Sequence, residues 1–126
     1  MNINELIKNY LNGLQIGNLE HLLSVFDENA VVVSPLYGTL CAKQFYSDLF
    51  KDTNNSKITL LNIFNSSENK NTCAGHFKYE WTMKDDTEVT FECVDVFEIT
   101  DEIKIKKLTI IYDTYGAVRD SFNKLV

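Results

Sequence analysis

Residues 72–100 read TCAGHFKYEWTMKDDTEVTFECVDVFEIT, and this stretch decides the fold class. Two runs rich in aromatic and β-branched residues, 72–84 and 88–100, flank the polar pair Asp85-Asp86. Such runs are typical of strands, and the polar pair between them predicts a turn. Side chains alternate between the two faces of a strand. In the first run, Cys73, Phe77, Tyr79, Trp81 and Met83 would therefore face one way, and His76, Lys78, Glu80, Thr82 and Lys84 the other.

The second run carries an acid on its apolar face. Alternation places Asp95 in the middle of a face otherwise formed by Phe91, Cys93, Phe97 and Ile99. An ionised carboxylate costs several kcal/mol there unless it is paired or takes up a proton. A neutral acid in an apolar pocket can donate a hydrogen bond to a ligand oxygen, so Asp95 is a candidate functional residue. The alternative is a structural hydrogen bond to Tyr79, Tyr112 or Trp81.

The first half of the chain predicts helices. Apolar residues recur at spacings of three and four from Ile3 to Leu14, which is typical of an amphipathic helix. Gly17 would end this helix, and Asn18 would cap a short second helix that buries Leu19, Leu22, Leu23 and Phe26. Thr39 would cap a third helix over residues 40–51, whose inner face holds Cys41, Phe45 and Leu49.

Strands are predicted to dominate the rest of the chain. A short strand over residues 30–34 ends at Pro35, and residues 57–65 and 103–113 form strands on either side of the central pair. Residues 114–126 would form an irregular or weakly helical tail. Helices followed by antiparallel strands indicate one α+β domain over residues 1–126, a cone-shaped barrel in which a curved antiparallel sheet wraps around three N-terminal helices. Such a sheet leaves a conical cavity suited to small molecules.

Composition narrows the class of protein. The chain is 44% hydrophobic and 24% charged with a net charge of −6, which argues against a nucleic-acid-binding surface. No apolar stretch is long enough to span a membrane, and the N-terminus shows no secretory signal. Three widely spaced cysteines and two histidines do not suggest a metal site, so reduced thiols in a cytoplasmic protein are expected.

Three polar side chains are predicted to meet in the cavity. Tyr10 lies on the apolar face of the first helix, Ser34 at the end of the first strand, and Asp95 in mid-strand. Aromatic residues would line the space around them. This predicted lining consists of Phe77, Tyr79, Trp81, Phe91, Phe97 and Tyr112.

Four short segments carry a family resemblance: YLNGLQIGNL at 10–19, FDENA at 26–30, Ser34-Pro35 and VDVF at 94–97. In these segments the sequence resembles the ketosteroid isomerases of the nuclear transport factor 2-like superfamily, which also includes the SnoaL-like polyketide cyclases. The resemblance implies that Tyr10 and Asp95 form an oxyanion hole, with Asp95 held protonated; the neutral carboxylic acid of this isomerase is a standard example of a perturbed pKa.

One departure from the family pattern concerns the general base. The family carries an aspartate before the proline that follows the first strand, whereas this chain has Ser34 there. A serine hydroxyl is too weak a base to remove a proton next to a ketone, and losing a positioned base typically costs about 10² to 10⁴ in rate. Glu80, Glu92, Glu98 and His76 are poorly placed by alternation, which leaves Asp113 or Asp95 itself as alternatives.

Three functions remain open from the sequence. The first is a cofactor-independent isomerase, cyclase or dehydratase that acts on an apolar carbonyl compound. The second is a protein that binds a small apolar ligand without turnover. The third is an interaction module that pairs as a homodimer through the outer sheet face, which carries Thr72, Ala74, His76, Lys78 and Glu80.

Overall fold

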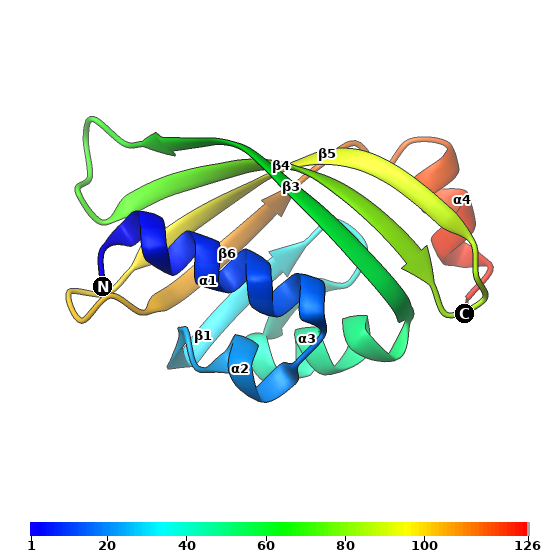
Figure 1. The fold of residues 1–126 in the computed structure, drawn as a ribbon, viewed down its shortest axis with the longest axis horizontal. Helices are drawn as coiled ribbons and strands as arrows, with labels where there is room; N and C mark the ends of the chain where they lie inside the picture. Colours follow the sequence, from blue (N-terminus) through cyan, green and yellow to red (C-terminus); the bar gives the residue numbers. More distant parts are fainter. Residues whose placement is uncertain (126) are drawn as a thin grey trace.

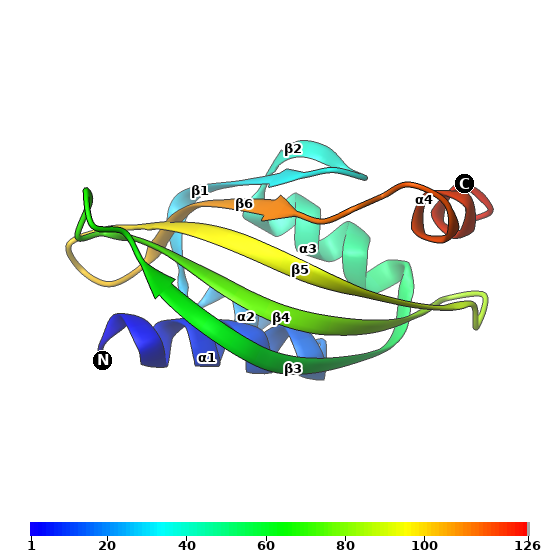
Figure 2. The same ribbon diagram turned by 90° about the horizontal axis from the view of Figure 1, so that it is seen from above.

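A long curved sheet arches over the helices of the N-terminal half in the computed structural model of the chain, which describes residues 1–125 (Figure 1). Three long antiparallel strands dominate the arch and run nearly its full length (Figures 1 and 2). The strands are β1 (Phe26–Ser34), β2 (Gly38–Cys41), β3 (Thr53–Asn65), β4 (Thr72–Met83), β5 (Glu88–Ile99) and β6 (Ile105–Ile111).

The sheet is mixed rather than wholly antiparallel. Its strand order is β2-β1-β6-β5-β4-β3, and β1 pairs in parallel with β6 while every other neighbouring pair is antiparallel. The expectation of an antiparallel sheet was therefore wrong at this one pairing. In the chain, β6 follows the whole β3–β5 meander and then pairs with the edge of β1 that β2 leaves free. Register shifts that place extra residues in β3 and β6 add to the curvature, since bulges bend the strand that carries them.

The N-terminal helices follow the capping signals in the sequence. Helix α1 (Ile3–Ile16) begins with the Asn2 side chain accepting a hydrogen bond from the Glu5 N–H. It ends at Gly17, whose φ of 77° favours glycine. Helix α2 (Leu19–Leu23) is capped by the Asn18 side chain, as predicted.

The third helix starts later than expected. Helix α3 (Ala42–Lys51) follows directly on β2, a short strand that the sequence pattern did not predict. Thr39 pairs with Val33 in that strand, so it does not cap the helix. Cys41 occupies the capping position and is exposed, instead of lying on the inner face. Phe26, predicted for the second helix, begins β1 and is buried there.

The core fills the concave side of the sheet. Leu6, Ile7 and Leu22 from the helices are almost fully buried. Phe97 and Leu108 from the sheet are buried with them. Burying aliphatic and aromatic side chains of this size contributes roughly 1.5–3 kcal/mol each, so this layer fixes how α1 lies under the sheet.

A fourth helix, α4 (Ala117–Asn123), lies in the region predicted as an irregular or weakly helical tail. Figures 1 and 2 both place it at the end of the molecule opposite the N-terminus, apart from the other helices. Gly116, with φ of 75°, precedes it. Val118 and Phe122 are its buried side chains.

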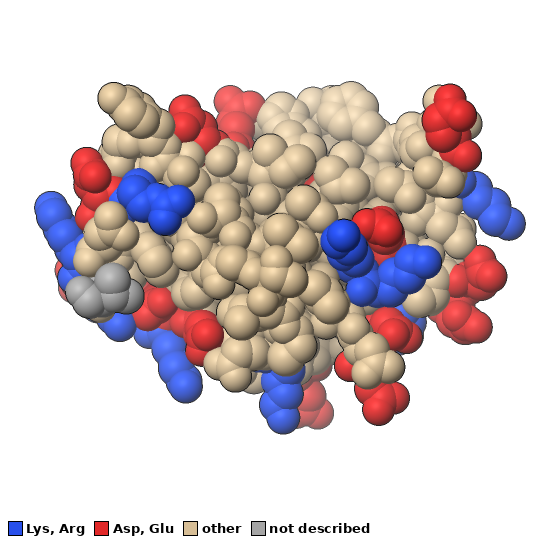
Figure 3. All heavy atoms as spheres, turned by 180° about the vertical axis from the view of Figure 1, so that it is seen from behind, with Lys and Arg blue, Asp and Glu red and all other residues tan. Residues whose placement is uncertain are grey.

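Charged groups of both signs surround the side of the molecule on which β1 and β2 lie. Seen from that side, blue and red side chains alternate around the rim, and the described residues form no continuous basic surface there (Figure 3). No helix within residues 1–125 is long and apolar enough to cross a bilayer.

Candidate functional site

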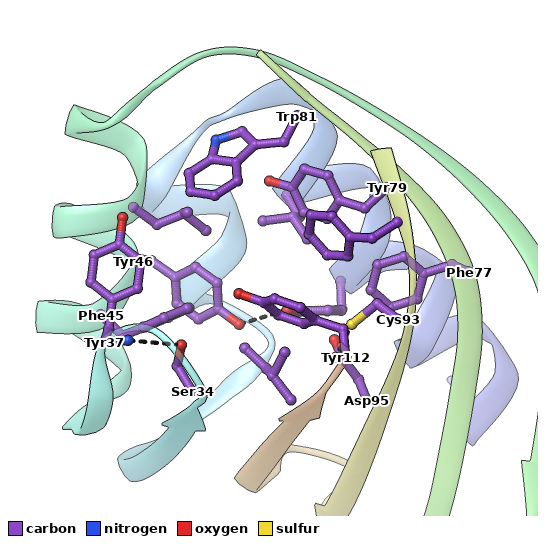
Figure 4. A pocket seen from close by; sticks show the side chains of 15 residues that line it. Ser34, Tyr37, Phe45, Tyr46, Phe77, Tyr79, Trp81, Cys93, Asp95 and Tyr112 are labelled. Carbon is purple, nitrogen blue, oxygen red and sulfur yellow. Dashed lines mark hydrogen bonds between the residues drawn. The ribbon is translucent and has the colours of Figure 1, made fainter. Parts of the chain in front are cut away.

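A pocket opens between the concave face of the sheet, α1 and α3. Fifteen residues line it, and five of the chain's six tyrosines are among them. Figure 4 shows side chains from both layers converging on one space. The pocket includes Tyr10, Ser34 and Asp95, so the structure brings the three predicted polar residues together.

Asp95 lies at the floor of this pocket and is 1% exposed. The Cys93 thiol donates a hydrogen bond to its Oδ1 at 3.1 Å. Burial raises the pKa of Asp95 to about 7, although the Cys93 and Tyr10 donors favour the charged form. Desolvation therefore outweighs hydrogen bonding, and it favours the neutral form of the carboxyl group.

Tyr10 is joined to a second tyrosine that the sequence pattern did not single out. Its hydroxyl lies 2.6 Å from the Tyr46 hydroxyl, and either one can donate (Figure 4). Burial raises the pKa of both phenols well above the usual value. Both hydroxyls therefore keep their protons, one proton lies between them, and the other is available to Asp95 or to a ligand oxygen.

Tyr46 was detectable in the sequence. Ala42, Phe45, Tyr46 and Leu49 are spaced by three and four, and all four are buried on one side of α3. The predicted inner face instead began at Cys41, because the helix was started too early. Tyr37, which also lines the pocket, lies in the turn between β1 and β2, where no periodic pattern identifies an inward residue.

Ser34 is held as a hydrogen-bond acceptor by the turn that follows it. Its Oγ accepts from the N–H groups of Leu36 at 3.2 Å and Tyr37 at 3.1 Å. These two bonds occupy both lone pairs of the hydroxyl, which leaves its proton as the one polar function that can face the pocket. Ser34 can donate to a ligand but cannot accept a proton from it.

Structural partners satisfy several polar groups of the pocket walls. The Tyr79 hydroxyl lies 3.0 Å from Ser56 Oγ, and the Trp81 Nε1–H donates to Thr53 Oγ1 at 2.8 Å. These two side chains are therefore not the partners of Asp95, and that structural alternative was wrong for both. Phe91 is sandwiched between Tyr79 and Tyr112, with ring centroids 5.4 and 4.3 Å away.

Five of the six predicted aromatic lining residues border the pocket, and Phe97 does not. Phe97 is fully buried beneath the pocket, with its ring 5.4 Å from the Tyr10 ring in an edge-to-face arrangement. It supports Tyr10 from below. Alternation placed Phe97 on the correct, concave face of the sheet. It does not tell how far along the cavity a residue on that face lies.

The other candidate bases lie outside the pocket. Asp113 is exposed at its end of the sheet, and its carboxylate accepts a hydrogen bond from the Tyr115 N–H at 2.9 Å. Glu92 and His76 lie on the opposite face of the sheet, 2.7 Å apart. Asp95 is the one carboxylate among the described residues that line the pocket.

The free space inside the pocket is small. The centre of a water molecule can occupy about 40 Å³ of it. A single water needs roughly 10–15 Å³, and an engineered apolar cavity that binds benzene has about 150 Å³. The resting pocket therefore has room for about three waters, and the side chains around it must move before a ring can enter.

Within residues 1–125, no group of three or more histidine, cysteine or acidic side chains is arranged to hold a metal ion. The polar side chains that line the pocket are one carboxyl group, one thiol, five phenols, the Ser34 hydroxyl and the Trp81 indole.

Solved structures share this arrangement of sheet and helices. An NTF2-like protein of unknown function from Exiguobacterium sp. 255-15 aligns with a TM-score of 0.74 at 16% identity, covering 86% of this chain and 98% of that one. The chain has the nuclear transport factor 2-like fold. The resemblance noted in the sequence is thereby confirmed for the fold.

Two further solved structures extend the comparison. A putative polyketide cyclase from Pseudomonas putida KT2440 aligns with a TM-score of 0.78 at 15% identity, over 94% of this chain and 97% of that one. TerC, co-crystallised with polyporic acid, aligns with a TM-score of 0.75 at 19% identity, over 98% and 96%. No protein-family model matches the sequence, and no curated protein does.

Proposed function

We propose that the pocket binds a small cyclic carbonyl compound and transfers a proton at the carbon next to its carbonyl group. The observation that carries this proposal is Asp95, a carboxyl group 1% exposed with a pKa of about 7, at the floor of an aromatic pocket. A general base works best when its pKa lies near the working pH. The reaction class is that of a cofactor-independent isomerase or cyclase.

Each polar group of the pocket has a distinct role in this proposal. The Asp95 carboxylate removes the proton from carbon, and negative charge develops on the carbonyl oxygen. The Tyr10–Tyr46 pair donates a hydrogen bond to that oxygen, since both phenols remain protonated. Ser34 donates a second bond and does not replace the family's base, because its lone pairs are occupied.

The aromatic walls favour a flat ligand. Tyr79, Phe91 and Tyr112 form a stacked row along one side of the pocket. An enolate is planar, so its ring can lie against these faces while its oxygen points at the tyrosine pair. The polyporic acid bound by TerC and the cyclase description of the Pseudomonas protein are consistent with a cyclic, oxygen-bearing ligand here.

Proton transfer is tested by hydrogen–deuterium exchange at the α-carbon of cyclohexanone and of 2-tetralone, followed by NMR in D₂O. The native protein should accelerate the exchange, and phenol, which resembles the enol, should inhibit it. Ser34→Ala should slow the exchange without abolishing it, because it removes one donor to the oxyanion and leaves the base in place. Binding of the ketones without accelerated exchange would favour a ligand-binding protein without turnover. An inactive but folded Ser34→Ala variant would contradict the assignment of the base.

The outer face of the sheet supports a second proposal, a homodimer. Phe64 and Ile111 are 54% and 53% exposed. Phe64 ends a cross-strand row that continues through Ala74 and Val96, and Ile111 ends the adjacent row, next to Val94. Exposed apolar area of this kind marks association surfaces.

Charges around this apolar strip are self-complementary. Lys78 lies opposite Glu92, and Glu98 lies opposite Lys107. A second copy turned by a two-fold axis can therefore bring acidic groups onto basic ones. A partner of a different sequence would not carry this same self-complementary pattern of charges.

Sedimentation equilibrium checks the dimer. The expected mass is twice the 14.5 kDa of one chain, and Val96→Glu should reduce it to a single chain with unchanged circular dichroism. As a control, Thr82→Glu places the same charge at the far end of the same face. A native protein that sediments as a monomer at tens of micromolar would rule the dimer out.

A further inference from the structure

Helix α4 lies at the end of the sheet where β4 ends and β5 begins, beside the turn between β1 and β2 (Figure 1). The Arg119 guanidinium donates a hydrogen bond to the Pro35 carbonyl at 3.1 Å, in the turn between β1 and β2. At the other side, the pKa of Asp85 is lowered by hydrogen bonds from Thr87 and also by the charge of Lys124. Asp85 belongs to the turn between β4 and β5, and Lys124 follows directly on the last residue of the helix.

Phe122 points from this helix onto the pocket walls. Its ring centroid lies 5.0 Å from that of Tyr37 and 6.5 Å from that of Trp81. Tyr37 and Trp81 both line the pocket. Phe122 is 8% exposed, so its ring covers the outer side of these two walls and is itself shielded from solvent.

Because the cavity is small, the contact of Phe122 with the pocket walls affects which ligands can enter. With about 40 Å³ of free space, a ring can enter only if a wall moves. Hydrogen bonds hold three of the pocket walls in place: Tyr79 is bonded to Ser56, Trp81 to Thr53, and the Tyr37 hydroxyl donates to Asp52 at 2.6 Å. The Phe122 ring is held by packing alone, on a helix of seven residues.

We propose that Phe122 is a specificity-determining residue, whose ring blocks the outer end of the pocket and limits the length of the ligand. This inference rests on the proposed function for the nature of the ligand. A single aromatic ring needs small shifts of the lining side chains. A ligand of three or four fused rings needs the space that Phe122 occupies. The chain should therefore select one- or two-ring compounds over longer ones.

Access to the pocket is measured first, without any ligand. Trp81 is the chain's one tryptophan and is 2% exposed, so its fluorescence reports on this wall alone. Phe122→Ala should raise the constant for quenching by acrylamide severalfold. Val118→Ala is the matched control, because it removes buried apolar atoms from the same helix and leaves the Phe122 ring in place. Equal quenching in the native protein and Phe122→Ala would overturn the proposal.

Ligand length is measured next, by calorimetric titration with phenol, 2-naphthol and equilenin, a four-ring phenol. Phe122→Ala should tighten equilenin binding by about tenfold or more relative to phenol, the size of effect that apolar pockets give for such differences. Phe122→Leu keeps the helix packed, and its affinity for equilenin relative to phenol should lie between those of the native protein and Phe122→Ala. A uniform change for all three phenols would mean that Phe122 stabilises the helix without selecting ligands, and would overturn the proposal.

The two proposals fail in different ways. If no phenol binds to any variant while Trp81 quenching still rises in Phe122→Ala, the phenol-like ligand of the proposed function is wrong and the blocking role of Phe122 stands. If phenol binds to the native protein and equilenin binds equally well, the proposed function stands and the length limit is wrong.

Discussion

Asp95→Asn should slow α-proton exchange in a bound ketone by roughly 10²–10⁴-fold, the usual loss when a positioned base is removed. Asparagine has nearly the same shape and can still bond with Cys93 and Tyr10, so the pocket should keep its form and its affinity for phenol within a small factor. The loss would then fall on the rate of exchange rather than on binding. Exchange kinetics and phenol titration of the same samples separate the two effects.

The pH dependence of the exchange rate distinguishes a base from a hydrogen-bond donor. If the Asp95 carboxylate removes the proton, the rate rises with pH and levels off above about 7, where the group is ionised. If the neutral acid donates to the oxyanion, the rate falls above the same pH. Glu88→Gln, an acid-to-amide change at an exposed position of the same strand, is the control and should follow the native profile. A native rate that falls above pH 7 would contradict the role of Asp95 as the base.

Asp95→Asn should stabilise the folded protein at pH 8 by on the order of 4 kcal/mol. Urea unfolding followed by Trp81 fluorescence measures this difference. An unfolded aspartate titrates near 3.8, and burial raises the folded pKa of Asp95 to about 7. A tenfold difference in proton affinity between the folded and unfolded chains corresponds to about 1.4 kcal/mol. Asparagine cannot ionise, so the variant avoids the cost of holding a charge in an apolar site.

The sign of this effect follows from proton binding. Between pH 4 and 7 the unfolded chain has released the proton of Asp95 and the folded chain keeps it. The Asp95 contribution to the free energy of unfolding therefore falls by about 1.4 kcal/mol for each rise of one in pH over this window, and is constant above it. The difference between Asp95→Asn and the native protein should grow from pH 4 to 7 and then stay level. A difference that is the same at pH 4 and pH 8 would contradict the raised pKa.

Alternation in one strand was enough to predict the central residue of the site. The period of two along residues 88–100 placed Asp95 among apolar neighbours, and the structure finds it almost fully buried. The caps at Gly17 and Asn18 were also readable, because each depends on local backbone chemistry. These signals act within a few residues of the chain, and for that reason a single sequence contains them.

Features that depend on contacts between distant parts of the chain could not be predicted from the sequence. The parallel pairing of β1 with β6 joins segments about 75 residues apart, and no local pattern marks it. Tyr46 was missed through a two-residue error in the start of α3. Phe97 was assigned to the pocket because alternation defines a face but not a depth, and the tail gave no sign that Phe122 would cover Tyr37 and Trp81.

The protonation state of Asp95 is the central claim, and NMR measures it directly. With ¹³C-labelled aspartate, the Cγ shift of Asp95, assigned by its loss in Asp95→Asn, is followed from pH 4 to 9. A midpoint near 7 is expected, because the side chain is almost fully buried in an apolar pocket. A midpoint near 4, the value of an exposed aspartate, would show that the carboxyl group is solvated or paired in solution, and the account of the pocket as an acid–base site would fail.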